Sequence, residues 1–206
     1  GGKLYEAFVQ SAFPPGDPYH TPTVGTWEDL RALTAAKARE FHARHYTPAN
    51  AVGALVGDID IAAAKTLLDR TFGLIPATAA HPEPAAPHPE RRPGERRVTV
   101  EYDARPSLLV GYHKPNAPHL DDYVADVLHD LLTHGRTSRL HRALVRDKSV
   151  VTRVGSFGAP GHRRPNLLAF SMQPRHPHTP ADAEAALYAE LDRLKAHPVS
   201  APELDK

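Results

Sequence analysis

A proline-rich stretch near the middle of the chain limits what the chain can fold into. Residues Pro76–Pro93, PATAAHPEPAAPHPERRP, include six prolines and five alanines, and no valine, isoleucine, leucine or aromatic residue. Each proline fixes its own φ angle, removes a backbone donor and drives the preceding residue toward an extended conformation. Such a stretch cannot form a core. It predicts a semi-rigid connector that reaches up to about 55 Å.

This connector divides the chain into two segments that each carry folding signals. We expect residues 1–75 to form the C-terminal part of a first α/β domain, and residues 96–206 to form a second that is truncated at its C-terminus. Residues 76–95 would join them as a Pro/Ala-rich linker. The alternative is a long surface loop inside one domain, but structureless loops of this length are uncommon in compact domains.

Composition and charge exclude several classes of function. Hydrophobic residues make up 41% of the 206 residues, enough for a core, and 25 basic residues balance 24 acidic ones to a net charge of +1. This balance does not favour nucleic acid or an anionic membrane as a partner. No apolar run approaches the ~20 residues of a membrane span. The absence of cysteine excludes disulfides and thiolate chemistry, and it leaves the compartment open between periplasm and cytoplasm.

The first segment carries mainly helix signals. Apolar spacing and capping residues predict helices over Leu4–Phe13, Thr34–Tyr46 and Asp60–Gly73. The loop after the first helix is rich in turn-forming residues, and we expect Tyr19 and Trp27 to be buried in it. The apolar run within residues 50–58 predicts a buried strand. Because one strand cannot form a sheet, we expect its partners to lie upstream of Gly1.

The second segment predicts the larger core. Alternating apolar and polar residues predict a half-exposed strand over Val98–Tyr102. A continuous apolar stripe predicts that the helix over Pro118–His134 is buried along one side. Further strands are predicted over Ser107–His113, Val150–Phe157 and Asn166–Gln173, and further helices over Thr137–Lys148 and Thr179–Ala196.

Both ends of the chain carry incomplete helix signals. Only Gly1, Gly2 and Lys3 precede the first predicted helix, and none of them is a good N-cap. Ser200 and Glu203 match a capping box, but the chain ends before a helix of ordinary length is complete. We therefore expect the chain to be a fragment of a longer protein.

Three stretches of the chain carry a family resemblance. They are PYHTPTVGTWEDLRAL at residues 18–33, FHARHYTPANAVGALVGDID at residues 41–60, and LLTHGRTSRLHRALVRDKSVV at residues 131–151. Together with the order of the predicted elements, they resemble the pitrilysin-type (inverzincin) zinc metallopeptidases, which include insulin-degrading enzyme and mitochondrial processing peptidase.

The resemblance implies both a fold and a chemistry. The fold would be α+β, of the pitrilysin-like or LuxS-like metallohydrolase type, with a mostly antiparallel sheet and helices packed on one face. The parent protein would hydrolyse peptide bonds with a zinc-activated water, between two halves that close around an unfolded peptide. In the family, a helix of the catalytic half carries an inverted His-x-x-Glu-His motif, and a later Glu completes the zinc site.

The chain departs from this pattern at the metal site. No Glu is next to a His in either order, so the zinc motif is absent, and we expect neither metal ligands nor catalytic residues in this chain. Two explanations remain open. The chain is the middle fragment of a zinc endopeptidase and is inactive alone, or it belongs to a non-catalytic subunit that encloses substrate or pairs with an active subunit.

Arg146 is the one candidate for substrate binding. In family members the non-catalytic half supplies an Arg, and a Tyr seven residues later, which help to bind substrate near the zinc. The resemblance places Arg146 at the Arg position and Arg153 at the Tyr position. The substituted pair indicates a segment that does not complete an active site, so a structural or surface role for Arg146 stays open beside the functional one.

The histidines, and the basic residues in and next to the predicted helix 137–148, are weaker candidates for a functional site. His42 and His45 lie one helical turn apart, as metal ligands do, but no third ligand is evident. We expect the other candidate histidines to be solvated; they are His129, His134, His141, His176 and His178. The basic residues suggest either an anionic partner or a solvated helix face. They are Arg136, Arg139, Arg142, Arg146 and Lys148.

Overall fold

A computed structural model describes residues 2–76, 94–197 and 199–204. The chain forms two compact units, one comprising Gly1–Val24 and Pro87–Lys206, the other Gly25–Ala86. Apart from Pro76, the expected connector lies outside the described residues. These units group the first residues with the last ones, whereas we expected a division into 1–75 and 96–206. The domain boundaries of the complete protein stay a prediction.

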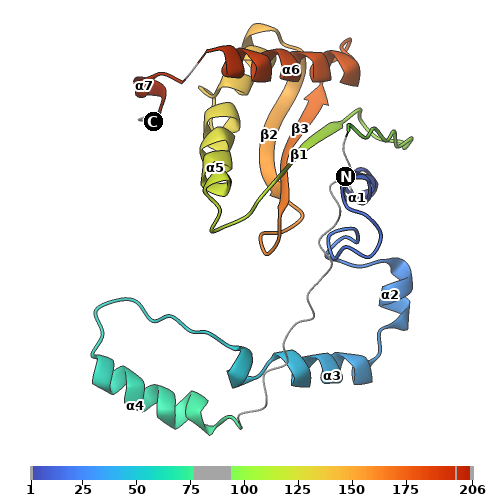
Figure 1. The fold of residues 1–206 in the computed structure, drawn as a ribbon. Helices are drawn as coiled ribbons and strands as arrows, with labels where there is room; N and C mark the ends of the chain where they lie inside the picture. Colours follow the sequence, from blue (N-terminus) through green and yellow to red (C-terminus); the bar gives the residue numbers. More distant parts are fainter. Residues whose placement is uncertain (1, 77–93, 198, 205–206) are drawn as a thin grey trace. The chain divides into compact units, whose positions relative to one another are not determined.

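The first unit is built on a three-stranded antiparallel sheet (Figure 1). Its strands are β1 (Leu108–Lys114), β2 (Val151–Ala159) and β3 (Asn166–Pro174), in the spatial order β1-β3-β2. Three of the four predicted strands of the second segment are therefore confirmed. β3 lies in the centre and pairs with both neighbours, so β1 and β2 form the two edges of the sheet within the described residues.

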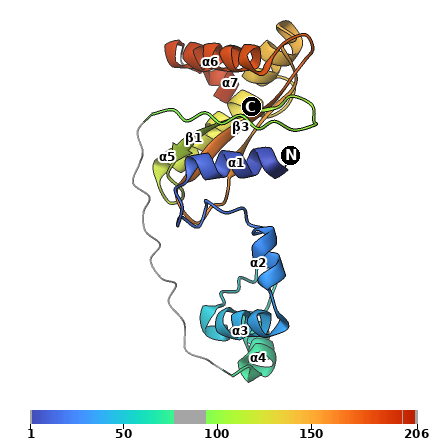
Figure 2. The ribbon, with the colours of Figure 1, turned by 90° about the vertical axis from the view of Figure 1, so that its right-hand side faces the viewer.

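Helices cover both faces of this sheet (Figure 2). One face carries the main core, which is formed with α5 (Leu120–Thr133), the π-helix η3 (His141–Asp147) and α6 (Pro180–Ala196). The other face carries α1 (Gly2–Ala12), whose Val9 packs with Phe13 and Leu167 in a second cluster. The arrangement confirms the α+β class and the antiparallel sheet, and it places α1 opposite the other helices.

Capping residues begin the predicted helices where expected. In α6 the Thr179 hydroxyl accepts from the backbone N–H of Asp182, and the Asp182 carboxylate accepts from that of Thr179. This capping box satisfies two N–H groups that have no partner inside the helix. The short helix α7 (Ala201–Leu204) follows Ser200, whose carbonyl accepts from the backbone N–H groups of Glu203 and Leu204.

Only part of the apolar stripe of α5 is buried. Ala125 and Leu132 are buried in the core, with Leu132 only 1% exposed. A second set of apolar side chains on the same helix is 48–72% exposed, comprising Leu120, Tyr123, Val124 and Val127. The expectation of one continuous buried stripe was wrong, because the sheet contacts one side of the helix and the apolar residues span two.

The expected strand at residues 98–102 does not form. Val98 is 54% exposed and Tyr102 is 65% exposed, and neither belongs to a strand. The side chains that precede them are held elsewhere, since Arg96 donates to the Ser11 carbonyl on α1 and Arg97 to the Glu184 carboxylate on α6. A strand needs a neighbouring backbone, and these contacts hold the segment without one.

The second unit consists of short helices. They are α2 (Trp27–Ala32), α3 (Ala35–His45), the 3-10 helix η1 (Pro48–Asn50), α4 (Ile61–Thr71) and the 3-10 helix η2 (Phe72–Leu74). Thr34 and Asp60 cap α3 and α4 as predicted, accepting from backbone N–H groups three residues later.

Apolar side chains of the second unit are exposed where we expected burial. Trp27 is 73% exposed, whereas Tyr19 in the first unit is half-buried against Phe13, so only one of the two predicted loop contacts is confirmed. Residues 51–58 form no strand, and Val52 is fully exposed. No described residue supplies a strand beside them, so their backbone N–H and C=O groups lack the inter-strand hydrogen bonds that a β-strand requires.

Candidate functional site

Arg146 lies on the surface of the first unit. It is part of η3, the helix that packs against β2, and its side chain is 63% exposed. Its Nε donates to Asp147 Oδ1 at 2.7 Å, and this hydrogen bond lowers the pKa of the Asp147 carboxyl. Arg153 is also exposed, on β2 at a register irregularity between Val151 and Arg153. The predicted pair thus occupies a helix and the neighbouring edge strand.

Two other basic residues of this region, Arg139 and Lys148, are held by carboxylates of the chain. Arg139 forms two hydrogen bonds of 2.7 Å to Glu203 of α7, and its side chain is only 18% exposed. The Arg139 guanidinium lowers the pKa of the Glu203 carboxyl. Lys148 Nζ contacts Glu190 Oε1 at 3.2 Å, and the Glu190 side chain is 4% exposed. For Arg139 the interpretation as part of a solvated helix face was wrong, because its side chain is mostly buried against Glu203. This partner lies 64 residues away in the sequence.

His129 belongs to a polar cluster that the sequence did not indicate. Its Nδ1 lies 2.6 Å from Ser156 Oγ on β2, and Thr133 Oγ1 lies 2.6 Å from the same oxygen. Thr133 Oγ1 also lies 3.0 Å from the His129 carbonyl, and the Ser156 hydroxyl is within hydrogen-bond distance of both side chains of this cluster. The cluster therefore links α5 to β2 through side-chain hydrogen bonds.

The expectation that His141 is solvated was wrong, because its ring is half-buried and its Nδ1 is buried. Three further histidines lie in unrelated surroundings. His42 stacks on Tyr46 with 4.8 Å between ring centroids, and His45 packs on Phe41 at 4.5 Å. His134 is exposed near Asp130 on the helix surface. The structure brings none of these rings together as a metal site would require.

Zinc does not fit the residues that the structure describes. Within those ranges no group of three or more His, Asp or Glu side chains converges as a metal site requires. The sequence also lacks both zinc-helix motifs. The described part likewise contains no helix that is long and apolar enough to cross a membrane.

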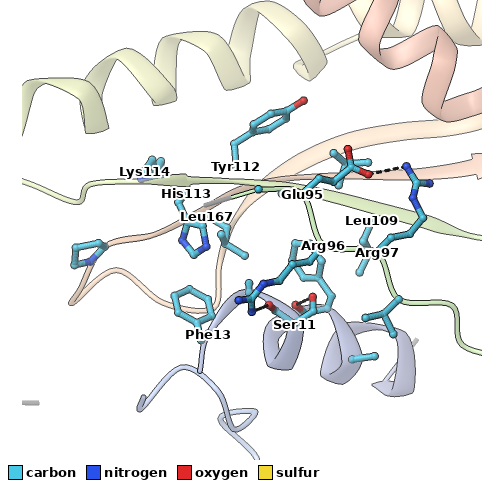
Figure 3. A pocket seen from close by; sticks show the side chains of 18 of the residues that line it. Ser11, Phe13, Glu95, Arg96, Arg97, Leu109, Tyr112, His113, Lys114 and Leu167 are labelled. Carbon is cyan, nitrogen blue, oxygen red and sulfur yellow. Dashed lines mark hydrogen bonds and ion pairs between the residues drawn. The ribbon is translucent and has the colours of Figure 1, made fainter. Parts of the chain in front are cut away.

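A cavity of about 930 Å³ follows β1 (Figure 3). All seven residues of β1 line it, together with part of α1 on one face of the sheet, and with Glu184 and Tyr188 of α6 on the other. Because its lining comes from both faces, the cavity surrounds the edge of β1. Burial raises the pKa of the Tyr188 hydroxyl to about 12, with a smaller contribution from the nearby Glu184 carboxylate. The sequence identifies β1 as a strand, but its edge position follows only from the strand order.

A second cavity, of about 1370 Å³, lies between α5, η3, the end of α6 and α7. Its walls carry the Arg139–Glu203 pair and the apolar side chains of Val127 and Leu204. Arg193 also lines it and pairs with Glu190 at 3.4 Å. Arg139 and Arg193, which line this cavity, are each paired with a glutamate of the chain.

Comparison with known proteins identifies the family. The family model described as "Peptidase M16 inactive domain" matches residues 32–206. The chain belongs to this family. It is 27% identical over 210 residues to the zinc protease PqqE of Helicobacter pylori, a match that covers 100% of this chain and 46% of that protein. The chain thus spans about half the length of this relative.

Solved structures agree with the M16 assignment. A protease from Helicobacter pylori superposes with a TM-score of 0.83 at 26% identity, covering 99% of this chain and 50% of the other. A peptidase M16 inactive domain from Pseudomonas fluorescens has a TM-score of 0.78 at 20% identity, covering 99% of this chain and 49% of the other. The first comparison supports the family, and the second shows the fold. The inactive-domain description agrees with the missing zinc motif.

Proposed function

We propose that this M16 chain is a middle portion of a zinc endopeptidase, one that helps to enclose an unfolded peptide while another half holds the zinc. The observation that carries the proposal is an M16 inactive-domain match over residues 32–206 in a chain without a zinc motif. Zinc hydrolysis needs a metal-bound water, a general base and an open coordination position. The sequence contains no zinc-helix motif, so the contribution that we propose for this chain is binding and enclosure.

Arg146 is the residue we assign to peptide binding within this function. Its guanidinium is exposed on η3, the helix that contacts the edge strand β2, and its one ion-pair partner among the described residues, Asp147, is its sequence neighbour. An arginine in this position can donate to peptide carbonyls or to an acidic side chain. Arg153 stands where the family has a tyrosine, so we expect the contribution of Arg146 to be modest.

Reconstitution tests the proposal. The chain is mixed with an M16 half that carries an intact His-x-x-Glu-His motif, and hydrolysis of an unstructured, fluorogenic peptide is followed with and without chelator. We expect no hydrolysis by the chain alone and a rise in kcat/KM of about tenfold or more on mixing, since enclosure orients the substrate. Chelator-sensitive hydrolysis by the chain alone would contradict the proposal, and so would a mixture no more active than the zinc half.

Matched arginine variants test Arg146. In the reconstituted mixture, Arg146→Ala should raise KM by about two- to fivefold with little change in kcat, because the contact binds ground state and transition state alike. Arg136→Ala is the control, since Arg136 is an exposed member of the same basic set. Equal effects of the two substitutions would show that Arg146 acts only through its charge.

The complete reading frame of the gene distinguishes a fragment of the enzyme from a non-catalytic subunit. An inverted zinc motif there supports the first. Its absence from the whole reading frame supports a subunit that pairs with an active partner.

A further inference from the structure

Arg146 lies in a helical turn of unusual geometry. η3 is a π-helix, closed by a hydrogen bond of 3.0 Å from the Lys148 N–H to the Ala143 carbonyl five residues earlier. The Val150 N–H donates to the Leu144 carbonyl at 2.9 Å and completes the wide turn, directly before β2 begins. π-helices are rare and occur mostly as single wide turns, frequently at functional sites. A contact outside this backbone must favour the π register over that of an ordinary α-helix.

The wide turn decides which side chains face α6. Residues three and four apart share a face of an α-helix, so an α-helical register would place Asp147 over the buried Ala143 and Arg146 beside it. In the π register, the residue five positions on takes that place. Lys148 thus lies over Ala143, whereas Arg146 is turned to the surface, with its side chain 63% exposed.

Glu190 of α6 distinguishes the two registers. Its side chain is 4% exposed, and its Oε1 lies 3.2 Å from Lys148 Nζ. Its Oε2 lies 3.4 Å from Arg193 Nη1, on the next turn of α6. In an α-helical register the Asp147 carboxylate would take the place of the Lys148 ammonium, and two carboxylates would meet at a buried position. Like charges repel strongly where water is excluded, so Glu190 favours the π register.

The end of η3 carries backbone strain that neighbouring contacts hold in place. Ser149 has a φ angle of 52°, in the left-handed region that residues with a Cβ seldom adopt. Such conformations persist only where the surrounding structure fixes them. Ser149 lies between Lys148, which Glu190 holds, and Val150, which belongs to the main core. The junction between η3 and β2 is therefore fixed on both sides of the strained residue.

We propose that Glu190 is a positioning residue for Arg146. By holding Lys148 it keeps η3 in the π register, and this register directs the Arg146 guanidinium away from the core and toward the surface. The inference rests on the proposed function for the role of Arg146 in peptide binding. Glu190 itself is buried, so we expect it to act on substrate through Arg146 and not by direct contact.

A spin label tests the positioning without any activity. The chain contains no cysteine, so Arg146→Cys provides a single site for a nitroxide in the full chain. We expect Glu190→Gln to shorten the rotational correlation time of the label about twofold or more, because the turn is no longer held in one register. Asp192→Asn is the matched control, since it removes an exposed α6 carboxylate whose partner Lys195 lies on the same helix. It should leave the spectrum unchanged.

Lys148→Met breaks the same contact from the other side. The Lys148 side chain is 42% exposed, so this substitution removes the contact without changing the buried group on α6. We expect it to raise the mobility of the label as Glu190→Gln does. Thermal unfolding of each variant checks that the chain is folded. A spectrum that neither substitution changes would overturn the proposal.

The reconstituted peptidase tests whether this position matters for substrate. Glu190→Gln should raise KM about two- to fivefold, as we expect for Arg146→Ala, with little change in kcat. In the Arg146→Ala background the same substitution should add less than about 1.5-fold, because no guanidinium is left to position. Effects that multiply, or a loss confined to kcat, would refute the positioning role, since Glu190 would then act on something other than Arg146.

The positioning role and the proposed function can fail separately. If Arg146→Ala leaves KM unchanged, the role of Arg146 in peptide binding fails, and the spin label alone decides whether Glu190 holds the turn. If Arg146→Ala raises KM and Glu190→Gln does not, the role of Arg146 stands and the positioning by Glu190 is refuted.

Discussion

Truncating Leu132 on α5 tests whether the core lies where the structure places it. The side chain is 1% exposed and belongs to the main core with Leu140, Leu144 and Phe170. Leucine to alanine removes three carbon atoms, which at about 0.8 kcal/mol per buried CH₂ amounts to about 2.4 kcal/mol of lost transfer free energy. The cavity left behind raises the expected total for Leu132→Ala to about 3–5 kcal/mol.

Val127→Ala is the matched control on the same helix. Val127 is 48% exposed, so its truncation removes little buried surface and should cost less than about 1 kcal/mol. Urea unfolding followed by far-UV circular dichroism measures both. The fluorescence of Trp27 is unsuitable because this residue lies in the other compact unit. A loss below about 0.5 kcal/mol for Leu132→Ala, or equal losses for both variants, would refute the assignment of the buried face.

Two further predictions follow from contacts between distant parts of the first unit. Gly111→Ala should destabilise the fold by about 1–3 kcal/mol, because the new Cβ would lie 2.6 Å from Phe8 Cζ; Gly155→Ala, which meets nothing within 4 Å, is the control in the same urea assay. The Arg139 contact lowers the pKa of Glu203, so its contribution is fully present above the ordinary Glu pKa of 4.5 and is lost as the pH falls through the lowered value. The protection factors of the α7 amides, which correct for the intrinsic pH dependence of exchange, should fall as the pH drops over that acid range, and Glu203→Gln should remove this fall.

Local signals predicted most helix starts correctly. Thr34, Asp60 and Thr179 each accept from a backbone N–H three residues later, and this geometry depends only on neighbours in the sequence. The three strands of the sheet were also predicted, because each combines apolar content with flanking turn residues. These features need no knowledge of what packs against them.

A strand-like sequence pattern was not sufficient to predict a strand where no neighbouring strand is present. Residues 50–58 and 98–102 carry the composition of strands, yet neither forms one in the described structure. A helix satisfies its hydrogen bonds internally, whereas a strand needs a second backbone beside it. The sequence pattern of one segment does not indicate whether a second strand lies beside it in the fold.

In the candidate sites, too, the sequence indicated individual residues but not the contacts between distant ones. Arg146 was identified from sequence, through its position in a family motif, and the structure finds it exposed on η3. The pairing of Arg139 with Glu203 and the cluster of His129 with Ser156 join residues 64 and 27 positions apart, and no local pattern indicates them.

The sequence by itself determined the M16 family, the absence of a zinc motif and the approximate positions of the main helices and sheet strands. Only the tertiary structure decided which side of α5 is buried, that α1 covers the opposite face of the sheet, and that β1 is an edge strand beside a cavity. Residue type and spacing determine local hydrogen bonding and amphipathic pattern. Burial, edge position and cavities depend instead on which distant segments meet, because they are properties of contacts between elements.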